Sequence, residues 1–403
     1  MLTRATRVRL GLLIAGTTVA NIAMMTPSPS SASAAAATHE HAALQRLLDR
    51  AVAVGGVPGI LAEVRDGGRR WSGTAGVADT ATGRARRARD RYRIGSTTKT
   101  FVATVMLQLV AEHRVSLDDT VDRWLPGVVR GNGHDGGAIT VRRLLDHTSG
   151  IFNYTDDQAA LSRYPSPTPE QLLDIAMSHP PAFVPGTSWA YSNTNYILAG
   201  LIIERASGGT LADEIATRIA RPLRLAGTYL PRGADPVIHG PHSQHYTKKF
   251  QTGPDAVIYD ATEMDTSLFW ATGAMISTAG DLNRFFRALL SGRLLPAAQQ
   301  REMFTMVPTK DWIAGSAYGL GISSVTLSCG TTVWGMGGAL FGSFSYTYGT
   351  RDGEHMLAIN VNGDWTDGGW EDPIGIFTDA LEVEFRPGDS RAPRRSMEPA
   401  DPA

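Results

Sequence analysis

The sequence lacks a set of paired cysteines and several well-known nucleotide-binding and hydrolase motifs. It contains one cysteine, Cys329, which excludes an internal disulfide framework, so stability must come from a buried core. Nothing around Cys329 indicates an activated thiol, and we expect it to be a small residue of a strand. No phosphate-binding glycine loop, dinucleotide fingerprint or Gly-x-Ser-x-Gly motif is present, so these signatures assign no function.

A strong excess of one sign of charge is also lacking. The formal net charge of −1 over 403 residues does not favour a nucleic-acid partner. The densest basic cluster predicts a solvated face because an aspartate interrupts it; its members are Arg84, Arg86, Arg87, Arg89, Arg91 and Arg93. His239, His242 and His245 surround a Gly-Pro pair that predicts an irregular loop, so we expect no metal and no cofactor.

The only long apolar run lies at the start of the chain. Arg4, Arg7 and Arg9 precede an apolar segment that ends in Ala32-Ser33-Ala34. This order predicts a signal peptide over residues 1–34 and a secreted mature chain that begins near Ala35. The segment could instead stay as an anchor, but its small-residue exit favours cleavage, so we expect no stable membrane anchor.

Strand-like alternation occurs near both ends of the chain, and helical periodicity dominates the middle. We therefore predict an α+β fold with one antiparallel sheet built from both chain ends and flanked by helices. The predicted strands are 59–65, 70–77, 319–327, 332–336, 343–350 and 356–362.

The same pattern predicts a division into domains. Residues 40–97 and 272–385 form the predicted α/β sheet domain, and residues 98–271 form an inserted, mainly helical domain. The tail over 386–403 is rich in proline and arginine and is predicted to be disordered.

A serine and a lysine stand three residues apart where a helix is predicted to begin. Ser96 and Lys99 would share one face of that helix, so the amine could reach the hydroxyl. A partly desolvated lysine is neutral often enough to take the proton of a serine nucleophile. The spacing alone is a weak signal, and Ser96 could simply cap the helix. However, lysine is scarce, with Lys99 accompanied only by Lys248, Lys249 and Lys310.

Tyr191 and Asn193 follow a rigid Pro-Gly loop and precede an apolar helix. On an extended loop, residues two apart point the same way. A phenol there could relay a proton to a leaving group, and a carboxamide could orient the lysine and hold a substrate amide.

Several ordered motifs together carry a resemblance to a known family. They are Arg93-Ile94-Gly95-Ser96-Thr97-Thr98-Lys99, Leu144-Leu145-Asp146-His147-Thr148-Ser149-Gly150, Pro185-Gly186-Thr187, Tyr191-Ser192-Asn193, residues 273–281 and Tyr318-Gly319-Leu320-Gly321. In these motifs the chain resembles the serine penicillin-recognising enzymes, of the class C β-lactamase and actinomycete secreted D-alanyl-D-alanine carboxypeptidase type.

The resemblance implies acyl transfer through an acyl-enzyme. Ser96 would be the nucleophile, Lys99 and Tyr191 would move protons, and Asn193 would bind substrate. The backbone amides of Ser96 and Ala339 would form the oxyanion hole. His147 would be a structural turn residue.

The third family element departs from the usual pattern. Where the family has Lys-Thr-Gly or His-Thr-Gly, this chain has Met336-Gly337-Gly338, followed by Ala339. Methionine and glycine cannot bind a substrate carboxylate through their side chains. The backbone of Gly337, Gly338 and Ala339 would still let a substrate approach the strand closely.

The leading hypothesis is an exported serine hydrolase of the D-alanyl-D-alanine carboxypeptidase kind. Its partner would be a small peptide, amide or ester, such as a peptidoglycan stem peptide or a β-lactam. β-Lactamase, esterase, D-aminopeptidase and transacylase activities stay open within the same chemistry. A non-catalytic penicillin-binding protein is the alternative from another class.

Overall fold

The computed structural model of the chain describes residues 41–249, 251, 256–310 and 312–386. The predicted signal peptide, 1–34, and all but the first residue of the predicted tail lie outside these residues. Within the described residues, no helix is both long enough and apolar enough to cross a membrane.

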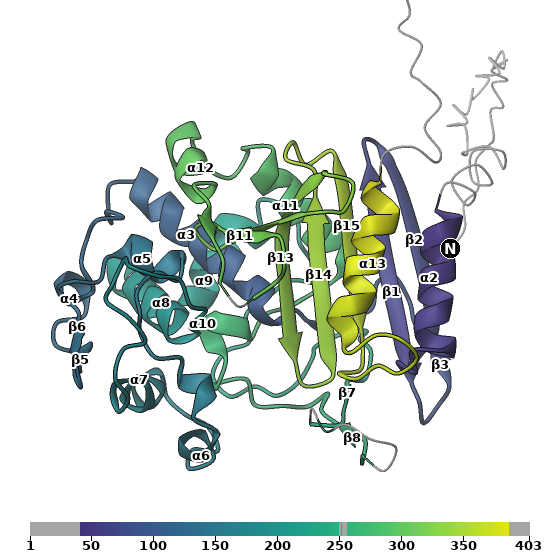
Figure 1. The fold of residues 1–403 in the computed structure, drawn as a ribbon, viewed down its shortest axis with the longest axis horizontal. Coiled ribbons are helices and arrows are strands. Elements are labelled where there is room, and N and C mark those ends of the chain that lie inside the picture. Colours follow the sequence, from purple (N-terminus) through teal and green to yellow (C-terminus); the bar gives the residue numbers. More distant parts are fainter. Residues whose placement is uncertain (1–40, 250, 252–255, 311, 387–403) are drawn as a thin grey trace, which may run out of the picture.

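Within the same residues, one antiparallel sheet of nine strands forms the largest element of the fold (Figure 1). Its strands come from both ends of the chain, because β1 pairs with β15 on one side and β2 on the other. In spatial order they are β10 (Val307–Pro308), β11 (Ser316–Tyr318), β12 (Ser323–Thr326), β13 (Thr332–Leu340), β14 (Ser343–Gly349), β15 (His355–Val361), β1 (Gly59–Asp66), β2 (Arg69–Asp79) and β3 (Arg84–Ala85).

The remaining elements are helices and two-stranded pairs. The helices are α2 (Ala42–Ala53), α3 (Thr98–Ala111), α4 (Val121–Trp124), α5 (Val141–Leu145), α6 (Gln158–Leu161), α7 (Pro169–Met177), α8 (Thr194–Ser207), α9 (Leu211–Ile215), α10 (Trp270–Gly273), α11 (Ala279–Leu290), α12 (Ala297–Met303) and α13 (Pro373–Phe385). The short pairs are β4 (Tyr92–Arg93) with β9 (Ile276–Ser277), β5 (Arg130–Gly131) with β6 (His134–Asp135), and β7 (Tyr246–Thr247) with β8 (Tyr259–Asp260).

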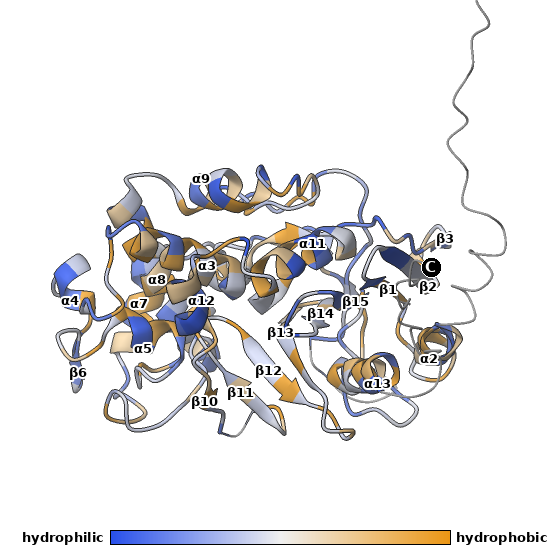
Figure 2. Cartoon of the chain, turned by 90° about the horizontal axis from the view of Figure 1, so that it is seen from above, coloured by the Kyte–Doolittle hydropathy of each residue, from blue (hydrophilic) through white to orange (hydrophobic). Residues whose placement is uncertain are grey.

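Helices cover both faces of the sheet (Figure 2). Helices α2 and α13 pack on one face, and their apolar residues join alternate side chains of β1, β14 and β15 in one core. Helix α11 packs on the other face against β1, β14 and β15, where it joins a larger core that includes α3 and α8. This arrangement confirms the predicted α+β fold, while the predicted domain boundaries stay predictions.

Helix α3 is central to the larger core. Apart from three residues near its C-terminal half, every residue of α3 is buried, including Lys99. A helix that is apolar on all sides must be enclosed by other elements, and α8, α10 and α12 pack against it. The start of α3 is therefore a rigid support next to β13.

One predicted strand is wrong. The segment 319–327 does not run as a single strand, because Gly321 adopts a φ of +75° and turns the chain between β11 and β12. The turn packs tightly on α3, since a Cβ on Gly321 would lie 2.4 Å from the Cβ of Ala103. Only glycine fits this close approach in a left-handed conformation.

Two further predictions are wrong, one on the position of Cys329 and one on the exposure of the arginine cluster. Cys329 lies in an exposed turn after β12, not in a strand. The arginine cluster is not wholly solvated, because Arg86 and Arg93 are buried. Arg93 donates to the carbonyls of Pro236 and Thr262, which replace the water that a buried guanidinium loses.

Candidate active site

Ser96 lies in a 3-10 helix, Gly95–Thr97, that leads into α3 and contacts β13. A Cβ on Gly95 would lie 2.6 Å from the amide nitrogen of Ala339, and a Cβ on Gly338 would lie 2.6 Å from the amide nitrogen of Ser96. Side chains at either position would force the two backbones apart. The two glycines therefore bring together the segments that carry the predicted oxyanion donors, the amides of Ser96 and Ala339.

Lys99 is fully buried beside the serine. Its Nζ lies 3.2 Å from Ser96 Oγ, 2.7 Å from Asn193 Oδ1 and 2.8 Å from the carbonyl oxygen of Thr272. Burial lowers the pKa of Lys99 well below its ordinary value. A neutral amine has two N–H donors and one lone pair, so the two carbonyl oxygens can take the donors. The lone pair is then directed at the Ser96 hydroxyl.

Tyr191 approaches the serine from the loop before α8. Its hydroxyl donates to Ser96 Oγ at 2.7 Å, and burial raises the pKa of this phenol. Tyr191 is therefore a neutral donor at physiological pH, which can hand its proton on and recover one from the serine. The ring of Trp312 stacks beside Tyr191, with 6.0 Å between the ring centroids.

His147 holds the loop that carries Tyr191. Its ring lies 4.4 Å from the Tyr191 ring between centroids, and its Nδ1 accepts the backbone N–H of Ser192 at 3.2 Å. Burial lowers the pKa of His147 well below its ordinary value. The residue has a φ of +63°, as a turn residue would. It is a neutral support for the phenol and does not contact Ser96 in a triad.

Asn193 is engaged at both ends of its side chain. Its Oδ1 accepts from Lys99, and its Nδ2 donates to Thr155 Oγ1 at 3.2 Å. The residue thus links the lysine to the segment before α6, and the structure shows it orienting Lys99. Substrate binding by Asn193 stays a prediction.

A cavity of about 320 Å³ opens over the serine. Its lining combines the catalytic candidates, the third family element and apolar side chains: Ser96, Tyr191, Trp312, Ile313, Met336, Gly337, Gly338, Ala339, Phe344, Tyr346 and Ile374. None of these residues carries a charge at neutral pH. The predicted site residues other than Lys99 and Asn193 therefore line one cavity, and these two lie directly behind it.

Tyr346 occupies the space beside the third family element. It faces Gly337 across the β13–β14 pair, and a Cβ on Gly337 would lie 2.5 Å from Cε2 of the Tyr346 ring. Met336 is buried next to it, and its sulfur accepts a weak hydrogen bond from Ser323 at 3.8 Å. The place of the usual hydroxyl is therefore taken by an aromatic ring.

Sequence reasoning missed several of these groups. The Thr272 carbonyl has no side-chain signature, and Tyr346 reaches the site only through strand register.

The histidines do not form a metal site: within the described part of the chain no three histidine, cysteine or acidic residues gather as one. His245 is buried, whereas His239 is exposed and pairs with Asp235.

Known proteins share this fold and much of this sequence. The sequence profile of the Beta-lactamase family matches residues 44–370. A D-stereospecific amidohydrolase from Streptomyces sp. is 47% identical, with a TM-score of 0.77 over 86% of this chain and 98% of that chain. A D-amino acid amidase from Ochrobactrum anthropi SV3, complexed with L-phenylalanine amide, is 26% identical, with a TM-score of 0.74 over the same shares of the two chains.

Penicillin-binding protein 4* of Bacillus subtilis is 28% identical over 58% of this chain and 52% of that protein. The chain thus spans about half the length of the curated relatives that match it first, such as this one. The family profile, in contrast, covers most of the chain and every residue of the site described above except Ile374. The chain belongs to the Beta-lactamase family and is a serine hydrolase of the fold shared by β-lactamases and penicillin-binding proteins.

Proposed function

We propose that the protein is a serine amidase that cleaves uncharged amides of D-configured acyl groups through an acyl-enzyme on Ser96. Lys99 takes the hydroxyl proton as Ser96 Oγ attacks the carbonyl carbon. The amides of Ser96 and Ala339 bind the oxyanion. Tyr191 gives its proton to the leaving nitrogen as the C–N bond breaks. Water then attacks the ester, and the same groups return the protons.

The observation that carries this proposal is the hydrogen bonding around Lys99. Complete burial favours the neutral amine, and the two carbonyl acceptors can take its two N–H groups, which leaves the lone pair for Ser96. A lysine placed only for packing would gain nothing from this arrangement, because burying an amine costs free energy. The arrangement supports a nucleophile activated by a neighbouring base.

The uncharged lining of the cavity over Ser96 supports an amidase over a carboxypeptidase. Tyr191, the proton donor to the leaving group, lines the uncharged cavity, so the leaving group must lie in that cavity. A free carboxylate there would lose water without gaining a cationic partner from the described lining residues. The similarity to the D-stereospecific amidohydrolase supports D-configured substrates.

The test has two parts, labelling and turnover. A fluorophosphonate probe should label the protein, and Ser96→Ala should abolish labelling. Ser328→Ala, which removes an exposed hydroxyl in a turn away from the site, is the matched control and should leave labelling intact. Purified protein should then cleave N-acetyl-D-phenylalanine amide in preference to its L-isomer. Labelling that survives in Ser96→Ala, or equal cleavage of both isomers, would contradict the proposal.

A further inference from the structure

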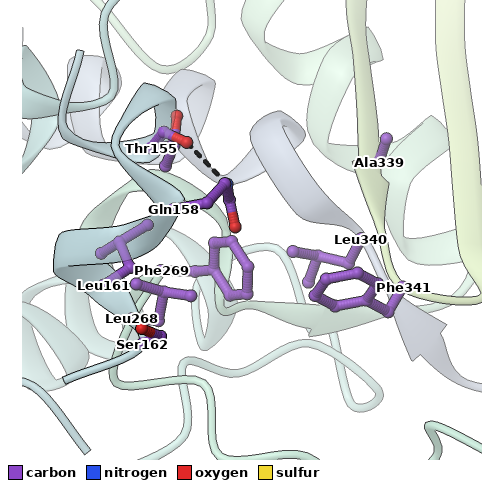
Figure 3. A pocket seen from close by; sticks show the side chains of 9 residues that line it. All are labelled: Thr155, Gln158, Leu161, Ser162, Leu268, Phe269, Ala339, Leu340 and Phe341. Carbon is purple, nitrogen blue, oxygen red and sulfur yellow. Dashed lines mark hydrogen bonds between the residues drawn. The ribbon is translucent and has the colours of Figure 1, made fainter. Parts of the chain in front are cut away.

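A second cavity meets the cavity over Ser96, which we call the leaving-group cavity, at Ala339, and Figure 3 shows the residues that line the second cavity. It has a volume of about 340 Å³, and Ala339 is the residue that both cavities share. Tyr191 lines the leaving-group cavity but not this one. The two halves of a substrate extend in opposite directions from the scissile carbonyl, and the amide of Ala339 is a predicted oxyanion donor. We therefore assign the second cavity to the acyl half of the substrate and call it the acyl-side cavity.

The acyl-side cavity is mostly apolar and has no charged side chain among its described lining residues: Thr155, Gln158, Leu161, Ser162, Leu268, Phe269, Ala339, Leu340 and Phe341. An apolar side chain of a substrate would bury its surface here. An ammonium group on the same substrate residue would find no carboxylate, so its desolvation would oppose binding. This cavity therefore suits a bulky apolar residue whose nitrogen is acylated.

A third cavity adjoins the second, and neither Ser96 nor Ala339 is among its described lining residues. It has a volume of about 800 Å³ and shares Gln158 and Phe341 with the acyl-side cavity. Phe341 follows Ala339 by two residues, a span of at most about 7 Å of chain. An acyl group that extends by one further residue beyond the acyl-side cavity can reach this space.

The chemistry of the third cavity differs from that of the acyl-side cavity. Its described lining includes Asp260, Glu263 and Lys249, and the Lys249 Nζ lies 4.0 Å from the centre of the Tyr259 ring. Among the described lining residues, two carboxylates outnumber one ammonium, so this part of the lining carries a net negative charge. A cationic group that is excluded from the acyl-side cavity would therefore be stabilised one residue further along.

Gln158 stands where the two compartments meet. Its Nε2 donates to the carbonyl oxygen of Thr155 at 2.7 Å. This bond fixes the carboxamide, and its oxygen lies on the side of Phe269 (Figure 3). An acceptor at the junction suits the N–H of an amide that joins two substrate residues.

We propose that the natural acyl donor is a peptide, with a bulky apolar residue at the scissile carbonyl and at least one residue before it. The apolar side chain would occupy the acyl-side cavity, and the preceding residue with its amino group would occupy the third cavity. Gln158 would be a specificity-determining residue at the amide between them. This inference rests on the proposed amidase activity at Ser96.

The test compares kcat/KM for four amides: D-Phe-NH₂, N-acetyl-D-Phe-NH₂, Gly-D-Phe-NH₂ and Gly-D-Ala-NH₂. We expect kcat/KM for Gly-D-Phe-NH₂ to exceed the values for D-Phe-NH₂ and Gly-D-Ala-NH₂ by tenfold or more. The value for N-acetyl-D-Phe-NH₂ should lie between those for D-Phe-NH₂ and Gly-D-Phe-NH₂. Gln158→Ala should reduce the ratio of Gly-D-Phe-NH₂ to D-Phe-NH₂ by about fivefold. Gln299→Ala, the same change on α12 outside the three cavities, should leave the ratio unchanged.

The outcomes separate this inference from the proposed function. If D-Phe-NH₂ is cleaved as well as Gly-D-Phe-NH₂, the peptide donor is wrong even though the amidase stands. If N-acetyl-D-Phe-NH₂ matches the glycyl compound, the third cavity takes no residue and the inference also fails. If Ser96 cannot be labelled and no amide is cleaved, the proposed function itself has failed.

Discussion

Binding of a substrate carboxylate at β13 should require three substitutions, at Met336, Gly337 and Tyr346, because the first two alone would clash with the Tyr346 ring. Met336→His with Gly337→Thr supplies the side chains of the usual third element. However, the threonine Cβ would lie 2.5 Å from Cε2 of Tyr346, a contact shorter than real Cβ atoms make. The double variant should therefore displace its new hydroxyl or the ring. Adding Tyr346→Ala makes room for the hydroxyl to face the cavity.

The size of the effect follows from the bonds gained and the packing lost. A hydrogen bond to a charged group contributes about 1.5–3 kcal/mol, which corresponds to about ten- to a hundredfold in kcat/KM. Tyr346 is buried and packs against Phe377, with 4.7 Å between ring centroids. Its truncation should lower the free energy of unfolding by about 3–5 kcal/mol, as for other large aromatic side chains.

The assay is the ratio of kcat/KM for two substrates that differ only in whether the leaving amine carries a free carboxylate or its amide. The natural protein should prefer the amide, and the triple variant should shift the ratio toward the free acid by tenfold or more. Tyr346→Ala alone is the control, because it opens the space and adds no donor. If the natural protein already prefers the free acid tenfold, or if the control shifts the ratio as far as the triple variant, the reasoning is refuted.

Four further predictions concern the base, the phenol, its support and the leader. Lys99→Ala and Tyr191→Phe should each slow acylation strongly but not multiplicatively, since one proton passes through both groups; multiplying losses in the double variant would indicate independent roles. Because the folded pKa of Lys99 is depressed, the unfolded state binds more protons between the folded pKa and about 10.4, the unfolded value. Lys99→Met should therefore stabilise the fold at pH 7, and the gain in unfolding free energy should shrink as pH rises toward about 10.4; a gain independent of pH would contradict this. His147→Ala should lower kcat about tenfold with little change in KM, and His147→Asn should recover part of it, because asparagine tolerates a positive φ and offers an acceptor to Ser192; equal losses in both variants would point to packing alone. N-terminal sequencing of secreted protein should find a start near Ala35, and recovery of the uncleaved leader would overturn the predicted signal peptide.

The sequence predicted the long strands of the sheet but not its edges or full extent. Strands such as β1 and β15 have enough alternating residues for a period of two to be visible. The edge strands β3 and β10 contain two residues each, too few for any pattern. Strand β13 runs four residues beyond the predicted 336, because its glycines have no side chains that could alternate.

The site was predictable to the extent that it is local in sequence. Ser96 and Lys99 are close because a helical turn brings residues three apart together. Tyr191 and Asn193 were assigned through resemblance, since nothing in a loop predicts where it packs. Tyr346 could not be foreseen, because its position depends on the register that pairs it with Gly337.

The glycines of the third element perform two separable tasks, and this separation explains how catalysis and specificity could diverge. Gly338 must lack a side chain because the Ser96 amide lies against it, so any substitution there disturbs the nucleophile. Gly337 faces the Tyr346 ring instead, so its smallness serves the ring and not the serine. A change at Gly337 therefore requires a matching change at Tyr346, while the nucleophile and its oxyanion donors need not move. Positions 337 and 346 thus form a coupled pair through which leaving-group preference can shift between charged and neutral groups without loss of acyl transfer.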